Sequence, residues 1–351
     1  MFLLLCNVFF ARSLKFIMLS PKRTFLYLSR VFQRMRFEKQ ELFKEIGKEG
    51  QRKLSEVYVT ILGCGALGAL AAELLVRAGV KNITLIDRDF VELSNLQRQS
   101  LYTERDVGSL KALVLAAHLK EINSLIKVKS FPVDLDVENV MLVKADIVLD
   151  CTDNMETRFL LNDFCKREKI PWVFAAVLGS SGFVFPVTKE GPCFACLFSE
   201  PSIPLGSCDT EGILNTAVAL VVSLQVTETM KIIVGKQFSK DLLSCNVWGN
   251  SLEKIKVKKR VACLTCKGVF EYISRKKENS LVKMCGMNLF QMRGKVSDLV
   301  LLEKRLVRLG KVRRGEHCLF FKELVIFKEG RVLIRAKSEA IAKSLYMRYL
   351  G

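Results

Sequence analysis

The sequence predicts an α/β protein with a Rossmann-like, mostly parallel sheet that continues into antiparallel strands, a zinc-knuckle site and a small α+β C-terminal domain. A β-branched apolar run at residues 57–61 enters the glycine pattern GCGALG at 63–68, and an Ala- and Leu-rich helical run follows. A second apolar strand, at 83–86, ends in Asp87, about 20 residues after the glycines, where a carboxylate can accept hydrogen bonds from ribose hydroxyls. This order of elements indicates a nucleotide site.

Each glycine of the loop has an expected role. Gly63 allows the tight turn, Gly65 lets backbone N–H groups approach phosphate oxygens, and Gly68 lets the helix and strand pack closely. The N-terminus of the helix then faces an anion. Nicotinamide and flavin enzymes share these features, so an NAD- or FAD-dependent oxidoreductase stays open as an alternative function.

A short polar segment after Asp87 favours a different kind of nucleotide site. It brings together groups that suit a triphosphate and a metal ion and that a dinucleotide site does not need. The segment resembles the family of ubiquitin-activating enzymes and their relatives MoeB, ThiF and HesA, in which D-x-D-x-V-x-x-S-N-L-x-R-Q follows the second strand. The matching residues are Asp87, Asp89, Val91, Ser94, Asn95, Leu96, Arg98 and Gln99.

The resemblance implies a homodimeric enzyme that uses MgATP to adenylate the C-terminal glycine of a small ubiquitin-like or sulfur-carrier protein ending in Gly-Gly. It assigns the ribose to Asp87 and an orienting role to Asn95. Arg98 and Lys111, the latter in V-G-x-x-K at the start of a helix expected at 107–123, would contact the phosphates, and Asp153 would serve magnesium and nucleotide. Arg98, Lys111 and Asp153 are thus expected catalytic residues, and Cys208 is the fourth. A non-catalytic partner subunit is a second alternative.

Residues 1–34 precede the family-like sequence. Their apolar run of about ten residues is too short to span a bilayer, and it lacks the flanks of a signal peptide. A membrane-surface anchor, a poor signal sequence and upstream codons wrongly included in the reading frame remain open. The last is favoured because family-like sequence begins at Met35.

From Met35 a helix is expected as far as residue 54, since apolar residues recur at near-helical spacing. The resemblance places Lys39 where relatives have an arginine that reaches the nucleotide site of the other subunit. A lysine keeps the charge but loses the planar fork that grips two phosphate oxygens. We therefore expect Lys39 to act in trans, less effectively than arginine.

Further strands are expected at 128–131, 145–149 and 170–177. Asp150 and Asp153 follow the second of these, where ligands bind in parallel sheets; Asp150 is expected to fix the loop, and Arg158 to pair with either carboxylate. Residues 179–185 begin the antiparallel set. Their small residues Ser180, Ser181 and Gly182 would leave a groove, which in the family receives the carrier's extended tail.

Two C-x-x-C pairs, 66 residues apart, predict a closed tetrahedral zinc site with a structural role. Its expected ligands are Cys193, Cys196, Cys263 and Cys266. A redox role for either pair alone is the alternative.

Cys208 lies in the segment GSCDTEG, ahead of a long buried helix expected at 213–234 whose N-terminus could lower the pKa of a nearby thiol. It is the one cysteine with an expected covalent role. Whether Cys208 takes part in the chemistry stays open. The twelve cysteines without a convincing signal peptide favour a reducing compartment, and hence the cytoplasm.

The domains are expected at 1–34, 35–272 and 273–351. The last is expected to be a βαββα unit with strands at 281–291, 317–326 and 331–335 and helices at 297–309 and 338–349. Basic and acidic residues number eight and one in 1–39, 22 and 26 in 40–249, and 25 and nine in 250–351. The basic excess therefore lies outside the nucleotide core, where an acidic protein, an RNA or plain solvation all fit. No specific nucleic acid and no membrane are expected as partners.

Overall fold

The computed structural model describes residues 36–198, 212–274, 282–283, 289–293, 298–315, 318–327 and 330–350. Two compact units, Met1–Gln51 and Arg52–Gly351, divide the chain. In the first unit, residues 36–41 are helical and residues 42–46 turn. Helix α3 (Gly47–Glu56), which continues beyond Gln51, begins at a glycine with a φ of 57°. The single helix expected up to residue 54 is therefore wrong: the chain turns, and Gln40 Nε2 donates to Gln51 Oε1 at 2.7 Å.

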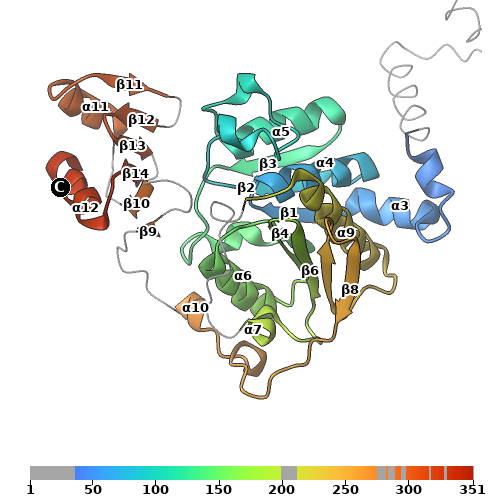
Figure 1. Cartoon of the computed structure of the whole chain (residues 1–351). Coiled ribbons are helices and arrows are strands. Elements are labelled where there is room, and N and C mark those ends of the chain that lie inside the picture. Colours follow the sequence, from blue (N-terminus) through green and yellow to red (C-terminus); the bar gives the residue numbers. More distant parts are fainter. Residues whose placement is uncertain are drawn as a thin grey trace, which may run out of the picture. The chain divides into compact units, whose positions relative to one another are not determined.

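The large sheet of the second unit has eight strands in the order β3-β2-β1-β4-β5-β6-β7-β8 (Figure 1). Its first five pair in parallel and its last three are antiparallel, as the sequence predicts. The parallel strands are β1 (Tyr58–Leu62), β2 (Asn82–Ile86), β3 (Lys127–Phe131), β4 (Ile147–Asp150) and β5 (Trp172–Leu178). The antiparallel strands are β6 (Ser181–Val187), β7 (Leu242–Asn246) and β8 (Ser251–Ile255).

The strand register determines what meets at the carboxyl edge of this sheet. Leu62, the last residue of β1, lies opposite Ile86 of β2 and Asp150 of β4. The glycine loop, Asp87 and the segment after Asp150 therefore leave the sheet side by side. In open α/β sheets this edge, at the crossover between neighbouring parallel strands, is where ligands bind.

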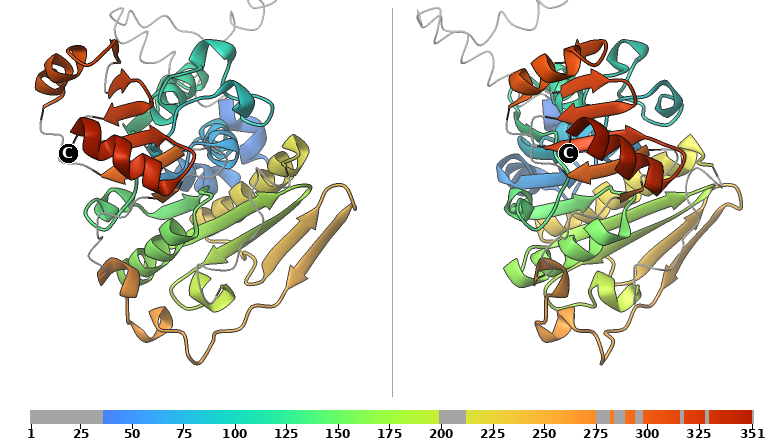
Figure 2. Two further views of the ribbon diagram at one scale, coloured as in Figure 1. Left: turned by 60° about the vertical axis from the view of Figure 1, so that its left-hand side comes forward. Right: turned by 90° about the vertical axis from the view of Figure 1, so that its left-hand side faces the viewer.

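Helices cover both faces of the sheet. Helix α4 (Ala66–Ala78) packs on α5 (Lys111–Ile122) and α9 (Asn215–Val234), while α6 (Met155–Glu168) contacts α7 (Phe194–Leu197) and α10 (Glu271–Ser274). Figure 2 shows α6 and α9 on opposite faces. Short 3₁₀ turns are η1 (Leu93–Asn95), η2 (Glu104–Asp106), η3 (Val140–Val143) and η4 (Thr265–Lys267).

Helix α9 is long and apolar enough to cross a membrane by length and composition, but half of that stretch is buried inside the structure. It packs along β5 and β6. A Cβ at Gly182 of β6 would lie 2.3 Å from Val221 Cγ2 of α9. Glycine at position 182 is therefore required by the packing of α9 on β6, and not by the groove expected from the sequence.

A second, antiparallel sheet follows, with the order β11-β12-β13-β14-β10-β9. The strands expected at 281–291 and 317–326 are each two strands, and β11 was not expected from the sequence. The elements are β9 (Val282–Lys283), β10 (Leu289–Arg293), α11 (Leu299–Val307), β11 (Val312–Arg314), β12 (Cys318–Phe321), β13 (Leu324–Phe327), β14 (Arg331–Arg335) and α12 (Glu339–Leu350). The βαββα expectation undercounts the strands because reversals such as the one at Lys322, which has a φ of 48°, occur without a glycine or proline.

Candidate nucleotide site

The glycine loop is held by close backbone contacts. Gly63 has a φ of 90°, and a Cβ there would lie 2.6 Å from the carbonyl oxygen of Cys151. A Cβ at Gly68 would lie 1.8 Å from the carbonyl oxygen of Gly63. At Gly65, by contrast, the nearest atom to a Cβ is Gln99 Nε2, at 3.8 Å. Gly63 and Gly68 are therefore required by packing, and Gly65 leaves space above the loop.

The two positions make a matched pair of tests. We expect Gly68→Ala to lower the free energy of unfolding by about 1–3 kcal/mol or more, because the methyl group overlaps a backbone oxygen that cannot move away. Gly65→Ala should change it by about 1 kcal/mol or less, because the position is open. Urea unfolding of both variants checks this, and equal stability losses would contradict the packing argument.

Asp87 ties the glycine loop to the polar segment. Its Oδ2 accepts from Cys64 N at 2.5 Å and its Oδ1 accepts from Asp89 N at 2.6 Å. Burial raises the pKa of Asp87, Asp89 adds to the rise, and Lys111 and the two amide donors oppose it. A carboxylate has about four lone-pair sites, so both oxygens can still accept from a ligand.

Lys111 is the first residue of α5 and is 7% exposed. Its Nζ lies 3.6 Å from Asp89 Oδ2. Burial opposes its charge, but the carboxylates of Asp89, Asp87 and Asp153 outweigh this and raise the pKa of Lys111. A buried ammonium thus remains charged beside three acidic groups. Among the residues that the structure describes, no side chain caps α4 at Gly65. Cation and uncapped helix N-terminus together suit a phosphate chain.

The S-N-L-x-R-Q residues lie on η1 and the turn after it. Asn95 is 8% exposed, and Arg98 Nη1 donates to the carbonyl of Ser94 at 3.1 Å. Gln99 Oε1 is buried without a hydrogen-bond partner among the residues that the structure describes. Since the Gln99 amide lies beside the open position at Gly65, a ligand bound over the loop could complete its hydrogen bonding.

Asp150 and Arg158 fix the loop after β4. Asp150 Oδ1 accepts from Thr152 Oγ1 at 2.7 Å, and Oδ2 accepts from Arg158 Nε at 3.1 Å. Of the two carboxylates considered for Arg158, it pairs with Asp150. Asp153 is exposed, and its charge contributes to the raised pKa values of Lys111 and Arg88. Asp153 therefore lies near enough to Lys111 and Arg88 to influence both charges, and its side chain is exposed to solvent.

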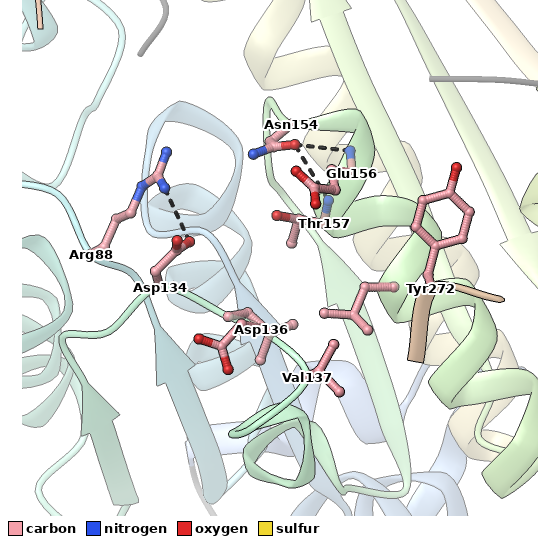
Figure 3. Close-up of a pocket in the computed structure, with 10 residues that line it drawn as sticks. Arg88, Asp134, Asp136, Val137, Asn154, Glu156, Thr157 and Tyr272 are labelled. Carbon is pink, nitrogen blue, oxygen red and sulfur yellow. Dashed lines mark hydrogen bonds and ion pairs between the residues drawn. The ribbon is translucent and has the colours of Figure 1, made fainter. Parts of the chain in front are cut away.

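A pocket lies at the same edge of the sheet (Figure 3). Arg88, from the end of β2, pairs with Asp134 at 3.1 Å across one wall. Asn154 caps α6 by accepting from the amides of Glu156 and Thr157 on the opposite wall. The remaining lining residues are Leu135, Asp136, Val137, Leu160 and Tyr272.

The four cysteines of the C-x-x-C pairs converge. Their Sγ atoms all lie within 4.8 Å of one another, with separations of 3.5 Å for Cys193–Cys263 and 3.6 Å for Cys196–Cys266. Tetrahedral zinc with bonds of about 2.3 Å requires sulfur–sulfur distances of about 3.8 Å. The cluster therefore fits a closed Cys₄ metal site.

Cys208 and Lys39 are the two remaining expected site residues. Cys208 lies outside the described residues. Lys39 is exposed on the helical segment of the first unit, and its role in trans stays a prediction.

The ThiF family profile matches residues 37–266. The chain belongs to the ThiF family. This ThiF-family protein is 37% identical over 333 residues to the sulfur carrier protein ThiS adenylyltransferase of Bacillus subtilis, covering 90% of the chain and 99% of that relative. The sulfur carrier protein adenylyltransferase of Thermus thermophilus is 36% identical and covers 66% of the chain and 90% of its own length. The B. subtilis similarity therefore extends into the C-terminal domain.

Solved structures support the fold of the ThiF-family protein. A crystal structure of Escherichia coli MccB with ATP aligns with a TM-score of 0.56 and 23% identity, covering 62% of this chain and 69% of that one. PaaA aligns with a TM-score of 0.56 and 19% identity over 71% of this chain and 78% of its own. At these identities the likeness concerns the fold alone.

The site of this ThiF-family protein also contains residues that sequence reasoning missed. Tyr102 is 5% exposed, and its Oη donates to the carbonyl of Cys64 at 2.7 Å and lies 3.3 Å from that of Lys111. It thereby holds the glycine loop against the start of α5. Arg88, between the two aspartates of D-x-D, is the second such residue. A single sequence carries no periodicity or spacing that singles out either residue.

Proposed function

We propose that the protein uses ATP to adenylate the C-terminal glycine carboxylate of a small sulfur-carrier or ubiquitin-like protein, releasing pyrophosphate. The observation that carries the proposal is the convergence of Asp87, Asp89 and the buried Lys111 on an uncapped, open glycine loop, in a chain of the ThiF family. The relatives in B. subtilis and T. thermophilus are named as adenylyltransferases of sulfur carrier proteins.

The chemistry requires charge neutralisation and positioning. A carboxylate oxygen attacks the α-phosphorus of ATP and pyrophosphate leaves, so negative charge is crowded around the reacting atoms. Lys111 and Arg98 offset this charge, Asn95 orients the phosphates, and Asp87 accepts from the ribose. The exposed carboxylate of Asp153 would hold Mg²⁺, which acts as a Lewis acid and neutralises phosphate charge when bound.

Several finer features belong to the same proposal. The carrier ends in Gly-Gly, because glycine lets an extended tail approach the backbone around the site closely. The enzyme is a cytoplasmic homodimer, and zinc at the four cysteines is structural, since four thiolates leave no coordination position open for water. The pathway that the adenylated carrier serves, sulfur transfer or protein conjugation, is set by the carrier.

The deciding experiment is ATP–pyrophosphate exchange with purified small proteins ending in Gly-Gly from the same genome. We expect exchange that depends on the carrier and stops when its last glycine is removed. Tight NADH binding without exchange would favour the oxidoreductase alternative. Failure to adenylate any carrier, with ATP still bound, would favour a non-catalytic partner subunit.

Lys39 provides a test of action in trans. Its ammonium can neutralise one phosphate charge but cannot bridge two oxygens, so Lys39→Arg should leave the exchange rate unchanged or raise it, whereas Lys39→Ala should lower it. Lys44→Ala, at another exposed lysine of the same unit, is the matched control and should have no effect.

Mixed dimers extend this test. Subunits carrying Lys39→Ala and subunits carrying Asp153→Ala should regain exchange activity on mixing, because one mixed dimer contains one site with both residues intact. Proven heterodimers without restored activity would mean that Lys39 is an ordinary surface lysine.

A further inference from the structure

The second sheet is covered on both of its faces. One face packs against α11 and α12 through residues such as Phe321, Ile326 and Ile334. Side chains alternate along a strand, and the residues between these point the other way. That second face, formed by Cys318, Phe320, Val325, Phe327 and Leu333, packs against Phe90, Leu110 and Leu113 of the adenylation domain.

The residues that cover this face are neighbours of the nucleotide-site residues. Phe90 follows Asp89, and Leu110 precedes Lys111. The ring of Phe90 lies 5.5 Å from that of Phe327 and 6.4 Å from that of Phe320, between centroids. Phe90 and Leu110 also form a β-bridge, and Lys111 N donates to the carbonyl of Asp89 at 2.9 Å. The apolar contact therefore holds both ends of the segment between Asp89 and Lys111.

A buried polar triangle forms a second connection. Arg88 Nη1 lies 3.1 Å from both Gln291 Oε1 and Asp134 Oδ1. Gln291 Nε2 donates to Asp134 Oδ2 at 2.9 Å, and Gln291 is 3% exposed. Gln291 thus accepts from the arginine and donates to the aspartate, which fixes the residue between Asp87 and Asp89 to strand β10.

Arg331 forms a third connection, to the main chain. It is 2% exposed, its guanidinium lies 3.8 Å from the ring centroid of Phe327, and its Nη2 donates to the carbonyl of Arg88 at 2.7 Å. This hydrogen bond to a backbone carbonyl constrains φ and ψ of the loop directly, whatever conformation the Arg88 side chain adopts. Three contacts therefore hold the three-residue segment 88–90.

We propose that the C-terminal domain is a positioning element of the nucleotide site, and that Gln291, Arg331 and Phe327 hold segment 88–90 in the conformation that receives ATP. This inference rests on the proposed function. If the segment lost these contacts, only a fraction of the molecules would have Asp87, Asp89 and Lys111 in place. The apparent affinity for ATP would then fall in proportion to the fraction of molecules in the binding conformation.

The test uses the full-length chain in carrier-dependent ATP–pyrophosphate exchange. We expect Gln291→Leu and Arg331→Met each to raise the KM for ATP about tenfold, as for loss of one hydrogen bond to a charged group, with kcat changed by less than about twofold. The KM for the carrier at saturating ATP should stay constant. Arg331→Lys can still donate to the Arg88 carbonyl, so it should restore most of the affinity.

The control is Ile334→Val, on the same strand as Arg331 but on the face that packs against the helices. It should lower the thermal midpoint by about 2–6 °C and leave the KM for ATP unchanged. A purely structural role of Gln291 and Arg331 would reduce the amount of active enzyme, so that kcat would fall at constant KM; that result overturns the inference.

Asp153→Ala separates this inference from the proposed function. If Asp153→Ala abolishes exchange while Gln291→Leu has the wild-type KM for ATP, the C-terminal domain has no positioning role and the adenylation function stands. If the wild-type chain supports no exchange with any carrier, the proposed function fails, and ATP binding by calorimetry still tests the positioning role.

Discussion

Arg98→Ala and Asp153→Ala should each slow carrier-dependent ATP–pyrophosphate exchange by at least about 100-fold, equivalent to about 2.7 kcal/mol of transition-state stabilisation. The reason is electrostatic. Charge develops on the phosphates while ordered groups face them, and removing one preorganised contact leaves that charge uncompensated. Initial exchange rates at saturating ATP and carrier measure the loss.

Matched controls exist for both substitutions. Arg77→Ala removes an exposed arginine that pairs with Glu73 on helix α4, and Glu190→Ala removes an exposed carboxylate near Lys189. Neither should change the exchange rate. Near-normal exchange in Arg98→Ala and Asp153→Ala, with both variants folded, would contradict the assignment of these residues.

The nucleotide loop could be predicted from the sequence because its constraints are local. Gly63 and Gly68 are required by contacts that follow directly from a strand, a tight turn and a helix, and these contacts hold in any chain with that order of elements. The convergence of Asp87 and Lys111 follows from the order of β2 and α5, because a helix that follows a parallel strand begins at the edge where that strand ends. A carboxylate after one strand and a lysine at the start of the next helix end up at one edge of the sheet.

The bracing of segment 88–90 could not be predicted in the same way. Arg88 and Gln291 are 203 residues apart, and nothing in either local pattern names the other. One signal was present: strands CLFF and LVIF are apolar at successive positions rather than at alternate ones. An antiparallel strand of this kind needs cover on both faces. The sequence thus implied a second packing surface, but not which part of the chain supplies it.

The second large effect concerns the four-cysteine cluster. We expect the purified protein to contain one zinc ion per chain, and Cys263→Ala to lose it. Zinc that binds the folded chain alone stabilises it by about 4 kcal/mol when free zinc exceeds its dissociation constant a thousandfold. For a domain of this size, loss of that stabilisation should lower the thermal midpoint of unfolding by about 8–16 °C. Elemental analysis and thermal unfolding measure the two effects.

The cluster joins two segments that lie 70 residues apart in the sequence. Cys193 precedes the four-residue helix α7 and Cys196 lies within it. Their partners lie near η4, where Thr265 Oγ1 donates to the buried Asp163 at 2.7 Å. Without zinc, the four thiols would still lie in contact, and the hydrogen bond from Thr265 to Asp163 would still join η4 to α6. Cys245→Ala, at a buried cysteine outside the cluster, should keep its zinc. The midpoint of the wild-type protein should rise with free zinc and that of Cys263→Ala should not; a metal-free wild type with the same midpoint would show that the four cysteines only pack.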